Sequence, residues 1–115
     1  MNSKLILTTI VLKTLDIEKS RGFYERLGLQ FEKHSHGNGP VHYACKEQNI
    51  LFEIYPAKEK LTNHMSLGFG TPDLVELRSK LIETAIPCSD IVDSEYGTLF
   101  TLRDPDDNRV EIYQF

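Results

Sequence analysis

A short motif that occurs twice constrains the fold of this chain more than any other feature. Phe52-Glu53-Ile54-Tyr55 matches Val110-Glu111-Ile112-Tyr113 at an offset of 58 residues. A repeat of this size predicts two similar modules, each of which is one supersecondary unit. A small sheet with one helix covers only one of its faces, so the modules are expected to set their open faces around a shared cavity.

The first module is predicted to run strand, helix, strand, strand, strand. Residues 5–12 are apolar and β-branched, which indicates a buried strand. Asp16 is a candidate helix N-cap, and Gly28 stands where a helix would stop. Three short strands are expected after the helix, at residues 30–33, 41–46 and 50–55.

The second module is predicted to repeat this order. Its helix would start at Thr71, which Pro72 follows, and would end before Pro87. Its strands are expected at residues 64–69, 88–92, 98–103 and 109–113. The sequence therefore predicts an α+β fold with two βαβββ modules of curved mixed sheets, at about 4–57 and 62–115, within a single domain of residues 1–115.

The composition excludes several classes of partner. The net charge is −4 and no run of Lys or Arg forms a stripe, which argues against nucleic acid and anionic membranes. No apolar segment is long enough to span a bilayer, and the first 13 residues lack the features of a secretory signal. Cys45 and Cys88 fit no metal spacing, so we expect two reduced thiols in a cytoplasmic protein.

The repeated glutamates are the first candidate functional residues. Side chains alternate along a strand, so the apolar residues of the two motifs would face the helices, and Glu53 and Glu111 would face away. On the opening strands, Thr9 and His64 are predicted to hold matching positions on the same open faces. One histidine and two carboxylates that converge there would suit a divalent metal, so Glu53, His64 and Glu111 are the candidate ligands.

Each of these residues also has a plainer interpretation. A single glutamate on a strand is more often exposed to solvent, although its recurrence at the same place favours a function. A lone His64 is more often a hydrogen-bonded residue at a strand end. His34 and His36 in HSHGNG could form a metal clip, but a flexible polar turn is the favoured interpretation, and His42 is a candidate to line the cavity.

Two tyrosines leave a similar choice open. Tyr55 and Tyr113 end the repeated motifs and share the faces of Glu53 and Glu111. They could stack on a ligand, or they could close the core between the modules.

Two segments resemble the vicinal oxygen chelate superfamily. They are LDIEKSRGFYERLGL, from Leu15 to Leu29, and LRDPDDNRVEIYQ, from Leu102 to Gln114, and a histidine opens the second half between them. The superfamily includes glyoxalase I, bleomycin-resistance proteins, fosfomycin-resistance enzymes and extradiol dioxygenases. The resemblance covers essentially the whole chain and implies two βαβββ modules and a homodimer, with modules paired within one chain or across two.

The resemblance to glyoxalase I also implies a metal site. Carried over, its ligand positions are Thr9, Glu53, His64 and Glu111. Thr9 departs from the family pattern, in which metal-binding members usually have His. A threonine hydroxyl is a weak ligand, so the metal affinity should fall, or the metal could be absent. The same departure weighs against the dioxygenases and the fosfomycin-resistance enzymes.

Two functions follow from the resemblance. The first is a metal-dependent lyase or isomerase of the glyoxalase type, similar to lactoylglutathione lyase, in which the metal is a Lewis acid and Glu111 or Glu53 is the general base. The alternative is a non-catalytic protein of the bleomycin-resistance type that binds a small molecule or a drug. The three ligand-type residues favour the enzyme, whereas Thr9 favours the binding protein. The substrate and the metal are not implied.

Overall fold

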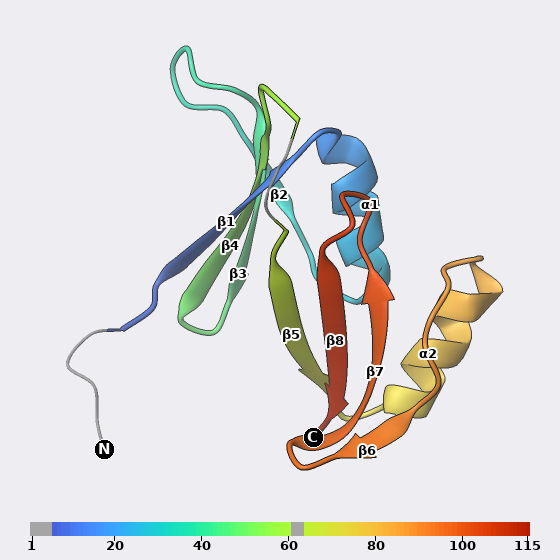
Figure 1. The fold of residues 1–115 in the computed structure, drawn as a ribbon. Helices are drawn as coiled ribbons and strands as arrows, with labels where there is room; N and C mark the ends of the chain where they lie inside the picture. Colours follow the sequence, from blue (N-terminus) through green and yellow to red (C-terminus); the bar gives the residue numbers. More distant parts are fainter. Residues whose placement is uncertain (1–5, 61–63) are drawn as a thin grey trace. The chain divides into compact units, whose positions relative to one another are not determined.

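The computed structural model describes residues 6–60 and 64–115, which form two compact units, Met1–Leu61 and Thr62–Phe115. Each unit contains one helix and one four-stranded mixed sheet (Figure 1). The predicted α+β fold with two βαβββ modules is therefore confirmed. The grouping of both units into one domain, residues 1–115, stays a prediction.

The first unit contains β1 (Thr9–Thr14), α1 (Ile17–Arg26), β2 (Glu32–His34), β3 (His42–Glu47) and β4 (Ile50–Pro56). The sheet order is β1-β4-β3-β2, in which β1 runs parallel to β4 and the other pairs are antiparallel. Asp16 caps α1 as predicted, because its Oδ1 accepts hydrogen bonds from the backbone N–H groups of Glu18 and Lys19, both at 3.1 Å. Gly28 follows the helix with φ of 114°, a left-handed conformation that favours glycine.

The core of the first unit lies between α1 and the sheet. Tyr24 is fully buried, and its ring meets that of Phe52 edge-on at 5.3 Å between centroids. Phe52 thus faces the helix, as the alternation predicted, and Ile54 on the same side of β4 is also fully buried. Cys45 lies in this core, and neither it nor Cys88 forms a disulfide.

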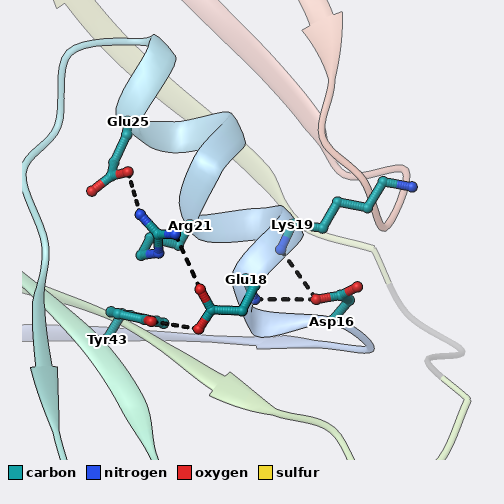
Figure 2. A network of polar contacts seen from close by, with 6 residues as sticks. All are labelled: Asp16, Glu18, Lys19, Arg21, Glu25 and Tyr43. Atoms are coloured by element: carbon teal, nitrogen blue, oxygen red, sulfur yellow. Dashed lines mark hydrogen bonds and ion pairs between the residues drawn. The ribbon is translucent and has the colours of Figure 1, made fainter.

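A polar network joins the first turn of α1 to β3 (Figure 2). The Glu18 carboxylate accepts hydrogen bonds from the Tyr43 hydroxyl and, at 3.0 Å, from Arg21, which also pairs with Glu25 at 2.5 Å. The Tyr43 hydroxyl, and then Arg21, hold the pKa of Glu18 below its ordinary value. The same hydrogen bond raises the pKa of Tyr43.

The second unit contains β5 (Ser66–Thr71), α2 (Leu74–Glu83), β6 (Val92–Ser94), β7 (Gly97–Arg103) and β8 (Arg109–Gln114). Its sheet order is β5-β8-β7-β6, and β5 runs parallel to β8. The second sheet therefore repeats the topology of the first. Leu74 and Leu81 are the buried residues of α2, on the apolar face predicted for it.

Several boundaries in the second unit differ from the prediction, and β5 begins at Ser66 rather than at residue 64. The N-cap of α2 is Asp73 rather than Thr71, because Thr71 is the last residue of β5 and its Oγ1 accepts a hydrogen bond from the Asp73 N–H at 3.2 Å. The sixth strand begins at Val92 rather than near residue 88. Ser89 does reach β7, through two 2.8 Å hydrogen bonds to the backbone of Thr101, but this is an isolated contact outside the regular ladder.

The DPDDN segment between β7 and β8 is held by a buried aspartate–asparagine pair. Asp104 Oδ1 accepts hydrogen bonds from the N–H groups of Asp106 and Asn108, and Asp104 Oδ2 accepts one from Asn108 Nδ2 at 2.8 Å. Asn108 Oδ1 in turn accepts a hydrogen bond from the N–H of Met65 at 2.6 Å. The motif therefore closes a turn and holds the segment that leads into β5.

Candidate functional site

Each sheet has one face packed on its helix and one face turned away from it, which we call the helix-free face. In the first sheet, Glu53 of β4 pairs with Val11 of β1 on one side and with Ala44 of β3 on the other. Because side chains alternate, the helix-free face of these three strands comprises Thr9, Val11, Lys13, His42, Ala44, Lys46, Leu51, Glu53 and Tyr55. Glu53 therefore lies at the centre of this face, as predicted.

Glu53 lies beside an imidazole–tyrosine stack. Its Oε2 is 3.6 Å from Nε2 of His42, and its side chain is 15 % exposed. The His42 ring stacks on Tyr55 with 4.1 Å between centroids and 9° between planes. Lys13 Nζ lies 5.2 Å from the centre of the Tyr55 ring, within the range of a cation–π interaction. One end of the helix-free face is thus a flat aromatic surface with a basic group beside it.

The other end of this face adjoins a hollow of about 550 Å³. Its walls include the apolar side chains of Phe31, Ala44 and Leu51 and the charged side chains of Glu32, Lys46 and Glu47. This volume lies within the range of about 300–1,000 Å³ that is typical of small-molecule sites. Because all the lining residues belong to the first unit, this hollow is complete within it.

Three histidines gather at the end of β2, in the turn that follows it and at the start of β3. One ring nitrogen from each of His34, His36 and His42 lies within 4.8 Å of the others. His34 and His42 are direct partners across the β2–β3 ladder. A metal clip of His34 and His36 was the less favoured of two interpretations of the sequence, and the position of His42 beside them was not predicted.

The helix-free face of the second sheet is different in character. Glu111 lies between Gly68 and Thr101, and its Oε2 is 3.3 Å from Nη2 of Arg109. Tyr113 lies near Gly68 and Gly97, where an added Cβ would come within 4 Å of its ring. By register, Gly68 and Gly70 stand where the first sheet has Val11 and Lys13, and Tyr113 stands where it has Tyr55.

The strand register corrects the predicted match between Thr9 and His64. Thr9 pairs with Leu51, which lies two residues before Glu53. The residue two positions before Glu111 is Arg109, and Arg109 pairs with Ser66. The counterpart of Thr9 is therefore Ser66. The error arose because the sequence placed the start of the second helix at Thr71, two residues before its actual N-cap.

His64 itself lies outside the strand ladder. It is exposed, precedes β5 by two residues and is four residues from Gly68, the partner of Glu111. Four residues of extended chain span up to about 13 Å, which is the greatest separation along the chain between His64 and Gly68. The assignment of Glu53, His64 and Glu111 as metal ligands, and of Glu53 and Glu111 as catalytic residues, stays a prediction.

Comparisons with known proteins agree with this architecture. Residues 6–112 match the family model of the Glyoxalase/Bleomycin resistance protein/Dioxygenase superfamily, and the chain belongs to this superfamily. The resemblance inferred from sequence is thereby confirmed. No curated protein sequence matches the chain.

Several solved structures share the fold. TnmS3, an antibiotic binding protein from Streptomyces sp. CB03234, has a TM-score of 0.81 and 16 % identity over 99 % of this chain and 98 % of that one. A lactoylglutathione lyase from Agrobacterium tumefaciens has a TM-score of 0.74 and 18 % identity over 98 % and 95 %. A bleomycin-binding protein complexed with bleomycin has a TM-score of 0.69 and 21 % identity over 97 % and 99 %. At these identities the likeness concerns the fold.

Neither helix in the described part of the chain is long and apolar enough to cross a lipid bilayer.

Proposed function

We propose that this protein binds a small organic molecule in the hollow of the first unit and does not transform it chemically. The observation that carries the proposal is the hollow itself, with its volume of about 550 Å³ and its mixed apolar and charged walls. Apolar surface with a few polar groups is the usual lining of a ligand pocket, because burial supplies affinity and the polar groups supply orientation.

The register-matched strand positions make a poor donor set for a zinc-like ion. They are Thr9 and Glu53 in the first sheet and Ser66 and Glu111 in the second, while the predicted ligand His64 lies outside the ladder. These four positions offer two carboxylates and two neutral hydroxyls, and they lack the imidazole or thiolate that zinc sites commonly include. The Glu111 carboxylate also has the Arg109 guanidinium of its own sheet 3.3 Å away. A binding role requires no metal there.

The walls of the hollow indicate the chemistry of the ligand. Phe31, Ala44 and Leu51 would contact an apolar or aromatic body. Glu32 and Glu47 outnumber Lys46, so the charged part of the lining carries a formal charge of −1 with His34 neutral. We therefore expect a drug-sized compound that is neutral or cationic and partly aromatic.

Two structural neighbours support a binding role by analogy. TnmS3 is an antibiotic binding protein, and the bleomycin-binding protein is complexed with bleomycin. Both share the fold of this chain, so the fold accommodates ligand binding without requiring catalysis.

The test is a binding screen with matched variants. Purified protein is titrated calorimetrically with bleomycin and a panel of neutral and cationic aromatic antibiotics, and each ligand is recovered and analysed by mass spectrometry. We expect at least one ligand to bind and to be recovered unchanged. Leu51→Glu, which places a charge in the hollow, should abolish binding, whereas Leu15→Glu at an exposed position outside the hollow should not. Equal binding by both variants, or chemical conversion of the ligand, contradicts the proposal.

A second candidate function is the metal-dependent lyase. It is favoured by the equivalent register of Glu53 and Glu111, which stand at the centres of the helix-free faces in both sheets. The test is turnover of methylglyoxal with several thiols in the presence of divalent metals. Turnover that disappears in both Glu53→Gln and Glu111→Gln would support the lyase and contradict the binding protein.

A further inference from the structure

The histidine group in the first unit is a candidate metal site whose ligands differ from the two glutamates, although His42 lies beside Glu53. His34 ends β2, His36 lies in the turn and His42 begins β3, with 5.3 to 5.7 Å between ring centroids. One nitrogen from each ring lies within 4.8 Å of the others. His34 and His36 are two residues apart and His42 is across the ladder, so the hairpin brings together residues from two segments.

The hydrogen bonds of His42 leave its Nε2 available as a ligand. Nδ1 lies 3.2 Å from the carbonyl oxygen of Pro40, and since a carbonyl only accepts, Nδ1 carries the proton. In the neutral ring the lone pair is then on Nε2. His42 is only 2 % exposed, and no group of the described residues hydrogen-bonds to this nitrogen.

The neighbour of that nitrogen is a carboxylate. Oε2 of Glu53 is 3.6 Å away, which is beyond a normal hydrogen bond. A buried lone pair opposite a carboxylate is unfavourable, because both groups are electron-rich and neither is solvated by a donor. A positive charge at Nε2, either a proton or a bound metal ion, removes this conflict, and the neighbouring imidazoles of His34 and His36 favour the metal ion.

His34 is oriented in a similar way. Its Nε2 lies 3.2 Å from Oε2 of Glu32, so donation to this carboxylate leaves Nδ1 with the lone pair. Histidines that bind metals usually donate their other ring N–H to a carboxylate or a backbone carbonyl, which holds the ring in place and strengthens the ligand. In this unit the Glu32 carboxylate is such a partner for His34, and the Pro40 carbonyl is such a partner for His42.

We propose that His34, His36 and His42 bind one divalent metal ion of the zinc class, with a fourth position left for water or a donor atom of a ligand. Imidazole suits Zn²⁺, Cu²⁺ and Ni²⁺, and three histidines with an open position are a known zinc arrangement. Zn–N bonds of about 2.0–2.1 Å in a tetrahedral site require about 3.4 Å between nitrogens. The three nitrogens, which lie within 4.8 Å of one another, would have to move closer on binding, and His36 is the exposed member of the group, whose side chain is the freest to rotate.

The test is metal titration of the untagged full chain, first stripped with chelator. Co²⁺ should give the visible absorption of a tetrahedral or five-coordinate site, and Zn²⁺ should displace it at one equivalent per chain. His36→Gln should weaken Zn²⁺ binding by more than about tenfold, the lower bound for loss of an outer partner. Asn38→Gln is the matched control, because Asn38 is exposed in the same turn as His36 and carries no imidazole. Absence of binding, or equal affinity in both variants, overturns the proposal.

A further variant separates metal binding from folding. Glu32→Gln keeps all three ligands, and Glu32 is exposed, so circular dichroism should be unchanged while Zn²⁺ affinity falls by about 10- to 100-fold. If Zn²⁺ affinity instead depends on Glu111 and not on His36, the metal lies elsewhere and the proposal is wrong. Glu32 and His34 also line the hollow, whereas His36 does not, so the His36→Gln titration is run without organic ligand and reports on the metal site apart from the hollow.

Discussion

Replacement of Asn108 by alanine tests whether the DPDDN motif is structural. Asn108 is 2 % exposed and bridges the Asp104 carboxylate and the N–H of Met65. A hydrogen bond to a charged group contributes about 1.5–3 kcal/mol, and a neutral one about 0.5–1.5 kcal/mol. Asn108→Ala removes one of each, so we expect the free energy of unfolding to fall by about 2–4 kcal/mol.

The assay is urea unfolding followed by circular dichroism, with ligand binding measured on the fraction that remains folded. Asn108→Asp is the matched control, because it keeps the acceptor for the Met65 N–H but places a second carboxylate beside Asp104. It should also be destabilised, and its loss should shrink as the solution is acidified and one carboxylate is protonated. A loss below about 0.5 kcal/mol for Asn108→Ala, the range of ordinary surface changes, would refute the structural role.

Three further predictions concern the first unit. The pKa of Glu18 is lowered in the folded state, so the stability that this carboxylate contributes is present above its ordinary pKa of 4.5 and is lost as the pH falls through the folded pKa. The difference in unfolding free energy between wild type and Tyr43→Phe, measured in urea, should therefore shrink in acid. A difference that does not change with pH contradicts this. Phe52→Ala should lower the free energy of unfolding by about 3–5 kcal/mol in the same assay, because Phe52 is buried in the core. Phe115→Ala, at a residue that is 77 % exposed, should change it by less than about 0.5 kcal/mol. Equal losses would contradict the assignment of Phe52 to the core. Asp16→Ala should cost about 1 kcal/mol through loss of the α1 cap, and an unchanged unfolding midpoint would exclude that role.

The two sheets share one topology but carry different chemistry on their helix-free faces. In the first sheet, Tyr55, His42 and Glu53 form a polar and aromatic surface at one end of the face, and the hollow adjoins the other end. In the second, Tyr113 lies near Gly68, and an added Cβ at Gly70 would come within 2.6 Å of the Phe115 ring. Because of this difference, both of our proposed sites, the hollow and the histidine group, are assigned to the first unit.

The order of elements and the faces of the strands were predictable from sequence because both follow from periodicity. Phe52 and Glu53 alternate, so the side of each was determined once the strand was recognised. Element boundaries were less predictable because capping depends on competing local bonds. Thr71 followed by Pro72 has the composition of a helix start, yet the strand pairing with β8 continues through Thr71 and the helix begins only after Asp73.

The site residues were harder to predict because they depend on register between strands. A shift of two residues keeps a side chain on the same face but changes its partner, and this is why His64 was aligned with Thr9 in place of Ser66. The histidine group was overlooked for a related reason. The pairing of His34 with His42 follows only when the register of the β2–β3 hairpin is known.

The most direct test of the proposed function is an NMR titration of the ¹⁵N-labelled protein with the tightest ligand from the screen, with the ligand spectrum followed in the same sample. The account predicts saturable amide shifts concentrated at the walls of the hollow, including Phe31, Ala44 and Leu51, while the ligand signals return unchanged after displacement. Shifts concentrated around Glu111 in the second sheet, or signals of a new product, would contradict it.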